Sequence, residues 1–206
     1  GGFKKRINSK YFENSVVNIG SILEEKEWNN ASTINLDGNT IKIFASNNSL
    51  YLAGTITDKT PLENSKLGNE LWDGDAIEVC MRSTPGNKTG SVRLSSVDIH
   101  AIFSMSANPK SWIYNKGEVL NNYNLATSKT STGYSFELEI PLAEFGVENL
   151  FLEQVYAFEI AIDEGNNQGR KSQVRWNAVN NPDFYTNPSV WGEIVFLKQN
   201  EDLSNL

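Results

Sequence analysis

The feature that most constrains this chain is a series of short segments in which apolar and polar residues alternate. Segment 134–140 is the clearest, because every second residue is large and apolar: Tyr134, Phe136, Leu138 and Ile140. A period of two places alternate side chains on opposite faces of a β-strand. Similar segments recur at 50–57, 98–105 and 156–163, and a helical period is almost absent. The pattern predicts an all-β fold.

Turn-forming residues separate these segments. Asp37-Gly38 stands between two short apolar runs, which is typical of a β-hairpin. Pro141 ends segment 134–140 and favours a one-turn helix through Phe145, because proline fits the first helical position. A second helical turn is predicted within 22–28. With about ten short strands, the chain is predicted to form an antiparallel β-sandwich of jelly-roll type with one or two single-turn helices.

The length of 206 residues fits one large β domain. We expect an N-terminal extension at residues 1–15, the sandwich at 16–198 and a C-terminal tail at 199–206. No change in composition marks a linker. Residues 1–6 read as a trimmed start, so we expect the native chain to extend upstream and to carry other domains.

The net charge of −7 and the few cysteines and histidines narrow the function classes. An acidic surface repels phosphate, so neither nucleic acid nor an anionic membrane is expected as a partner. No segment approaches the length of a transmembrane helix. Cys80 and His100 are the only residues of their types, which rules out an intrachain disulfide and zinc sites built from several His or Cys.

Segment 71–81 carries the strongest signal for a binding site. Trp72 stands in a turn rich in Asp and Gly, and alternation then directs Glu78 away from the expected core residues Ile77, Val79 and Met81. An indole can stack on the apolar C–H face of a sugar ring, while a carboxylate accepts hydrogen bonds from the hydroxyls. The alternative is that Trp72 closes the end of the core and Glu78 is a solvated strand residue.

Other polar residues are predicted on the same face by alternation, namely Glu78, His100, Glu159, Arg175 and Asn177. A cupped sheet face lined by such groups and rimmed by aromatic residues suits the recognition of hydroxyl groups. Glu78 with Glu159 or Asp163 could be drawn as the carboxylate pair of a glycoside hydrolase. Acidic residues on a polar sheet face are usually only solvated, so we do not predict an enzyme.

Five segments also carry a family resemblance through their order and spacing: 19–28, 50–58, 71–78, 133–142 and 191–197. In turn they resemble the motifs DG…D…W, LY(V/L)…V.D, W..D.(V/I)E, GY..E..IP and (F/W)G.(I/L).L of carbohydrate-binding module family 9. This family lies within the wider DOMON-like group of β-sandwiches. In the first motif Asn18 stands where Asp is usual.

The resemblance implies a non-catalytic domain that holds a sugar, often the end of a glycan chain, between two aromatic side chains. Trp72 matches the first aromatic and Tyr185 the second, with Phe184 next to it. Glu78 matches the binding carboxylate, and Asn181 lies near a loop amide that contacts sugar. The predicted ligand-binding residues, including Arg175 from alternation, are Trp72, Tyr185, Glu78, His100, Asn181, Phe184 and Arg175.

This chain departs from the family pattern at three of these positions. His100 stands where Arg is expected, Ala161 where a polar side chain is expected, and Tyr185 where the family has a second Trp. These differences leave open which mono- or oligosaccharide is bound and whether sugar binding is retained.

Two other functions stay open at this stage. Some DOMON-like domains bind haem, and here His100 with Met105 or Met81 would have to supply the axial ligands; alternation directs His100 and Met105 to opposite faces. The other is a docking module without a small ligand. No cofactor is predicted, although the resemblance is compatible with structural Ca²⁺ held by oxygen ligands. We expect a secreted protein (extracellular, at the cell surface or periplasmic) that serves glycan degradation.

Overall fold

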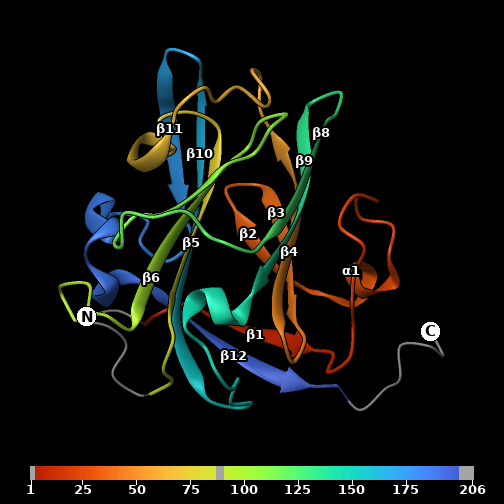
Figure 1. The fold of residues 1–206 in the computed structure, drawn as a ribbon, viewed down its shortest axis with the longest axis vertical. Helices are drawn as coiled ribbons and strands as arrows, with labels where there is room; N and C mark the ends of the chain where they lie inside the picture. Colours follow the sequence, from red (N-terminus) through yellow and green to blue (C-terminus); the bar gives the residue numbers. More distant parts are fainter. Residues whose placement is uncertain (1–2, 87–90, 200–206) are drawn as a thin grey trace.

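The structure is a computed structural model that describes residues 3–86 and 91–199. Over these residues the chain forms twelve strands in a single hydrogen-bonded sheet, with a few short helices (Figure 1). The strands are β1 (Arg6–Tyr11), β2 (Ser32–Leu36), β3 (Asn39–Ala45), β4 (Ser49–Thr57), β5 (Ala76–Arg82), β6 (Asp98–Ser104), β7 (Ser111–Ile113), β8 (Asn124–Lys129), β9 (Gly133–Pro141), β10 (Val155–Asn166), β11 (Gly169–Arg175) and β12 (Gly192–Lys198). The all-β prediction is confirmed.

The sheet curls so that its two arms face each other across one core. Its strand order is β7-β6-β5-β10-β12-β1-β3-β4-β9-β8, with β11 paired to β10 and β2 paired to β3. Figure 1 shows β5, β6 and β10 opposite β3, β4 and β9, with β1 and β12 crossing below. Apolar residues of both arms belong to one buried cluster, including Ile77, Val79, Phe158, Leu52 and Phe136. The alternation that predicted these inward side chains is therefore confirmed.

The prediction of an antiparallel sandwich is wrong at β1. This strand runs parallel to both neighbours, with Arg6 opposite Glu193 of β12 and Lys10 opposite Phe44 of β3. It joins the two arms into one continuous mixed sheet, so the sheet is not two separate layers of antiparallel strands. The strand also lies inside residues 1–15, which the sequence analysis set apart as an extension. Its polar sequence, RINSKY, gave no apolar alternation to reveal it.

The local signals at turns are confirmed. Asp37 and Gly38 both have positive φ, 48° and 87°, and join β2 to β3 in the hairpin that Asp-Gly predicted. After Pro141 the helix η2 (Leu142–Phe145) makes one turn and ends at Gly146, whose φ is 72°. Glycine suits this position because it has no Cβ and so adopts left-handed backbone without a steric penalty.

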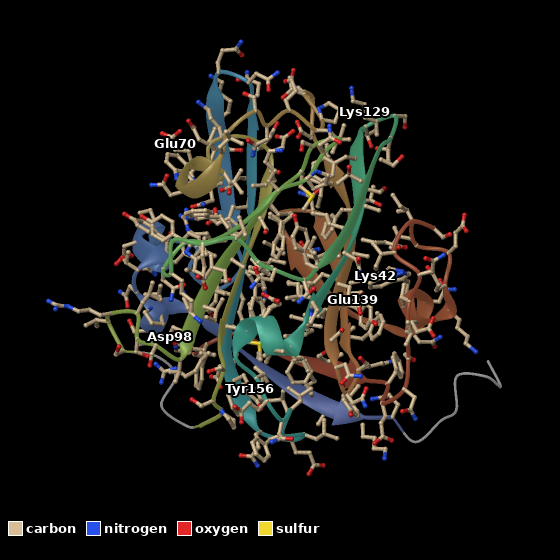
Figure 2. The ribbon with its side chains drawn as sticks, viewed as in Figure 1. Lys42, Glu70, Asp98, Lys129, Glu139 and Tyr156 are labelled. Atoms are coloured by element: carbon tan, nitrogen blue, oxygen red, sulfur yellow. The ribbon has the colours of Figure 1, made fainter. Side chains whose placement is uncertain are left out.

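The short helix α1 (Lys26–Asn30) covers the outer face of the β3–β4 arm. It buries Trp28, whose ring lies 5.2 Å from that of Phe44 between centroids. Figure 2 shows Lys42 of β3 beside this helix, where its Nζ donates to the Trp28 carbonyl oxygen at 3.1 Å. The helical turn predicted within 22–28 thus forms at the end of that range and beyond it.

The outer face of the β5–β6–β10 arm is covered by the loop between β11 and β12. This loop contains the one-turn helices η3 (Pro182–Tyr185) and η4 (Pro188–Val190). Phe184 and Trp191 are buried there against small residues of the sheet, Cys80, Ala157 and Ala161. Polar side chains on this face are consequently enclosed. The predicted tail lies outside the described residues beyond Gln199. None of the helices in the described ranges has the length and apolar character needed to cross a membrane.

Candidate functional site

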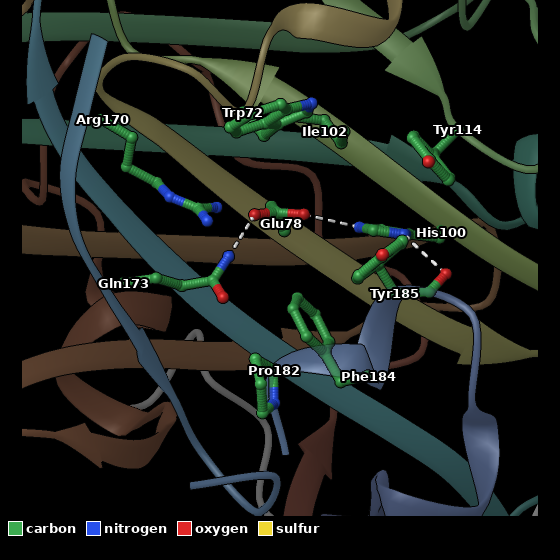
Figure 3. Close-up of a pocket in the computed structure, with 10 residues that line it drawn as sticks. All are labelled: Trp72, Glu78, His100, Ile102, Tyr114, Arg170, Gln173, Pro182, Phe184 and Tyr185. Atoms are coloured by element: carbon green, nitrogen blue, oxygen red, sulfur yellow. Dashed lines mark hydrogen bonds and ion pairs between the residues drawn. The ribbon is translucent and has the colours of Figure 1, made fainter. Parts of the chain in front are cut away.

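A cavity of about 220 Å³ lies where the loop meets the outer face of β5, β6 and β11 (Figure 3). Its wall combines aromatic rings with a small number of charged and amide side chains. The residues that line it are Trp72, Glu78, His100, Ile102, Tyr114, Arg170, Gln173, Pro182, Phe184 and Tyr185.

Trp72 is held at the mouth of the cavity by the turn that leads into β5. This turn follows the one-turn helix η1 (Gly68–Glu70). The Asp73 carboxylate accepts the backbone N–H of Arg170 at 2.8 Å and pairs with Lys66 Nζ at 3.4 Å. The turn is thereby fastened to β11. The guanidinium carbon of Arg170 lies 4.9 Å from the centroid of the Trp72 ring, a cation–π contact.

Glu78 and His100 form the floor of the cavity. The Glu78 Oε1 and His100 Nε2 atoms are 2.6 Å apart, and these side chains are only 2% and 1% exposed. Gln173 Nε2 donates to the other carboxylate oxygen at 2.9 Å. The second ring nitrogen of His100 faces the Tyr185 carbonyl oxygen at 3.4 Å. The floor is therefore tied both to β11 and to the covering loop (Figure 3).

Asp163 of β10 lies behind this floor and shares its donors. Gln173 Nε2 donates to Asp163 Oδ1 at 2.7 Å, and Arg170 Nη1 donates to the same oxygen at 3.2 Å. Burial opposes ionisation of Glu78, but hydrogen bonds from Asp163 and His100 and the nearby positive charges outweigh it and lower the pKa of Glu78 to about 2. Burial and the Glu78 charge raise the pKa of Asp163 well above its usual range. Glu78 is therefore ionised at neutral pH, and ionisation of Asp163 is disfavoured.

Aromatic residues of the loop, and Tyr114 directly after β7, close the other side. Phe184 is buried and packs on His100 with 5.6 Å between ring centroids. Its carbonyl oxygen accepts from Trp191 Nε1 at 2.8 Å, which fixes the loop to the sheet. Tyr185 is 41% exposed and meets the Tyr114 ring edge-on at 5.7 Å. Trp72, Tyr114 and Tyr185 thus form a rim that solvent reaches.

Five of the seven predicted residues line the cavity, namely Trp72, Glu78, His100, Phe184 and Tyr185. Arg175 does not: it donates to Gln173 Oε1 at 2.7 Å and to the carbonyl oxygens of Ala178 and Val179, so it positions Gln173 and the loop. Asn181 stands before η3, where its carbonyl oxygen accepts from Phe184 N, and it does not line the cavity.

Glu159 and Asn177, which were also predicted on the polar face, form hydrogen bonds away from the cavity. The Glu159 carboxylate accepts the backbone N–H groups of Asn177 and Ala178, both within 3.1 Å. Asn177 Nδ2 donates to the Val190 carbonyl oxygen at 2.8 Å. These side chains hold the start of the covering loop rather than the cavity.

The sequence analysis missed Arg170, Gln173 and Tyr114. Gln173 carried a usable signal, because it lies two residues before Arg175 and so on the same face of the strand. Tyr114 reaches the rim because its backbone N–H donates to the His100 carbonyl oxygen at 2.8 Å, a contact that no local pattern indicated. Arg170 follows a tight turn, and no local pattern indicated its direction.

The rival chemistries find little support in this arrangement. Among the cavity-lining residues of the described chain, Glu78 alone carries a carboxyl group, whereas a glycoside hydrolase needs two across the scissile bond. Met81 and Met105 lie in the central core, on the other face of the sheet from His100, so the His–Met pair that haem would need is not brought together. Within residues 3–86 and 91–199, no group of three or more His, Cys, Asp or Glu side chains is arranged to hold a metal ion.

Comparison with known families identifies the domain. The family model described as carbohydrate family 9 binding domain-like matches residues 7–199. The chain belongs to this family. The family 9 match begins within β1, in agreement with the part that this strand takes in the sheet. No curated protein sequence matches the chain.

Solved structures show the same fold at low sequence identity. A carbohydrate-binding module of family 9 from Caldicellulosiruptor kristjanssonii, in complex with cellotriose, is 19% identical, with a TM-score of 0.76 over 96% of each chain. A module of this family from the same organism, in complex with glucose, is 18% identical, with a TM-score of 0.73 over 96% of this chain and 98% of the other. The family 9 fold therefore extends over nearly the whole chain.

Proposed function

We propose that this family 9 domain binds carbohydrate in the cavity and is not itself catalytic. One observation carries the proposal: a buried, ionised carboxylate, Glu78, is held by His100 and Gln173 at the foot of an aromatic rim. Sugars present apolar C–H faces and polar hydroxyl edges, and this cavity offers a surface for each.

The aromatic rim suits the apolar face of a sugar ring. Trp72 and Tyr185 are both accessible at the mouth, and Tyr114 stands perpendicular to Tyr185. We assign stacking to Trp72 first, because Arg170 and the Asp73 turn hold it in place. Tyr185 forms the second wall, which the resemblance to family 9 had indicated.

The polar floor suits the hydroxyl edge. A carboxylate oxygen has more than one acceptor site, so Glu78 can accept from a hydroxyl while it keeps its bonds to His100 and Gln173. A buried polar group left unpaired costs roughly 1–3 kcal/mol, so a sugar whose hydroxyls match this floor is favoured over one that lacks them.

The size of the cavity supports a small ligand. About 220 Å³ is less than the roughly 300–1,000 Å³ of pockets that enclose drug-sized molecules. We therefore propose that one sugar unit enters and that the rest of a glycan extends past the rim, as binding of a chain end requires. The two family 9 modules in complex with glucose and with cellotriose support sugars as the ligand class.

Titration with sugars tests this proposal. Intrinsic tryptophan fluorescence is followed as glucose, cellotriose and a panel of other mono- and oligosaccharides are added. We expect a saturable change that is lost in Trp72→Ala and kept in Trp112→Ala. Trp112 is a matched control, since it packs on the same buried cluster as Trp72 but does not line the cavity.

The outcome also separates the proposal from a docking module. If no sugar in the panel binds to the folded protein, carbohydrate binding in this cavity is refuted. If sugars bind equally well to wild type and Trp72→Ala, the assignment of stacking to Trp72 is wrong.

A further inference from the structure

Arg170 is the part of the cavity that recognition of neutral hydroxyls leaves unexplained. Its side chain is 29% exposed, and its guanidinium group reaches from β11 into the cavity below Trp72 (Figure 3). One of its five N–H donors goes to Asp163, through Nη1. It therefore keeps donors and charge on the side where a ligand would lie.

The partner of Arg170, Asp163, is disfavoured as a charged carboxylate. Asp163 is buried and receives the same Gln173 amide nitrogen as Glu78, with 2.7 Å and 2.9 Å to the two carboxylates. Like charges that share a buried site do not both ionise. The pKa of Asp163 is raised well above its usual range by burial and by Glu78, which agrees with a proton held on Asp163.

Glu78 is hydrogen-bonded to groups other than Arg170. Its Oε1 lies 2.6 Å from His100 Nε2, and Gln173 Nε2 donates to its other oxygen at 2.9 Å. Glu78 alone among the cavity-lining residues of the described chain carries a carboxyl group, so the Arg170 guanidinium faces the cavity without a carboxylate partner there.

We propose that the cavity takes a sugar bearing a carboxylate, a uronic acid, and that Arg170 binds this carboxylate while Trp72 stacks on the ring. The inference rests on the proposed function and names its ligand class. A planar guanidinium binds a carboxylate through two parallel hydrogen bonds, a geometry that a hydroxyl does not reproduce. Arg170 also lies against the Trp72 ring, so the charged and apolar contacts adjoin.

Matched pairs of sugars test the proposal by calorimetry at neutral pH. Glucose is compared with glucuronate, and galactose with galacturonate, so that each pair differs at one carbon. Charge-assisted hydrogen bonds predict roughly tenfold to hundredfold tighter binding of the acid. The preference should fall as salt is added, because Arg170 is partly exposed.

Variants assign the preference to Arg170. Arg170→Gln should abolish the preference, measured as the ratio of the affinities for acid and neutral sugar in the same variant. Arg170→Lys should keep part of the preference, since the charge remains and the planar fork is lost. Lys66→Gln is the matched control: it removes one positive charge close by, paired to Asp73 and outside the cavity, and should keep the preference.

Three results would overturn the proposal while sugar binding stands. These are equal affinity for acid and neutral sugars in wild type, a preference that survives in Arg170→Gln, and a loss of preference in Lys66→Gln equal to that in Arg170→Gln. Failure of all four sugars, together with the wider panel, would instead refute carbohydrate binding and this inference with it.

Discussion

Replacing Glu78 by Gln is the most informative single change, because it keeps the shape of the side chain and removes its charge. Glu78 accepts from His100 Nε2 at 2.6 Å and from Gln173 Nε2 at 2.9 Å. A glutamine amide would turn an N–H₂ group toward one of these donors. Two buried N–H donors would then face each other without an acceptor, which costs roughly 1–3 kcal/mol. We expect the free energy of unfolding to fall by about that amount.

Ligand binding should fall further than stability alone explains. A hydrogen bond to a charged acceptor contributes roughly 1.5–3 kcal/mol, so the affinity for a neutral sugar such as glucose should fall about 10- to 150-fold in Glu78→Gln. Calorimetric titration measures the affinity, and urea denaturation measures the stability of the same sample.

Glu139→Gln is the matched control on the other arm of the sheet. The Glu139 carboxylate accepts from Ser49 Oγ at 2.8 Å, Tyr51 OH at 2.9 Å and Asn124 Nδ2 at 2.8 Å, far from the cavity in the sheet order. It should lose stability comparably and bind sugar like wild type. If the affinity of Glu78→Gln for glucose lies within about threefold of wild type, the Glu78 carboxylate does not bind the sugar.

Two further predictions concern stability. Gly133→Ala should destabilise the fold by about 1–3 kcal/mol or more, because a Cβ there would lie 1.9 Å from the Ile56 carbonyl oxygen; an unchanged urea midpoint would contradict the packing of β9 against β4. Burial, opposed by backbone hydrogen bonds, raises the pKa of Glu159 to about 7, against about 4.3 in an unfolded chain. The native state then holds a proton that the unfolded chain has released, so this contribution to stability falls as pH rises from about 4 to 7. Urea denaturation across that range should show a shallower decline in Glu159→Gln, and parallel declines in both proteins would contradict the assignment.

The strands were predictable where large apolar residues occupy one face and polar or small residues the other. Ile77, Val79 and Met81 alternate with polar or small residues, and this period fixed both the strand and the direction of Glu78. The hairpin at Asp37-Gly38 was predictable because few residues accept left-handed backbone. β1 was not predictable from the sequence, since it carries few apolar residues. Its position depends on parallel pairing with β12 and β3, which lie far away in the sequence.

The same distinction divides the site. Alternation found Glu78 of β5 and His100 of β6, and on β11 it indicated the face of Arg175 but not its partners. The Arg175 guanidinium binds the covering loop, and Gln173, which lies on the same face and donates to Glu78, was missed. Alternation predicts on which face of the sheet a side chain lies, but it does not predict which group that side chain binds.

The covering loop explains why the outer face of this sheet is a cavity and not a solvated surface. Trp191 and Phe184 bury themselves against Ala157 and Ala161, where larger side chains would leave no room for the loop. The small residue at Ala161, which departs from the family pattern, thus has a packing role in this chain. We propose that the β11 residues Gln173 and Arg170 supply the polar contacts that the resemblance to family 9 implies at position 161. These contacts include a guanidinium group, which is the basis of the acidic sugar proposed above.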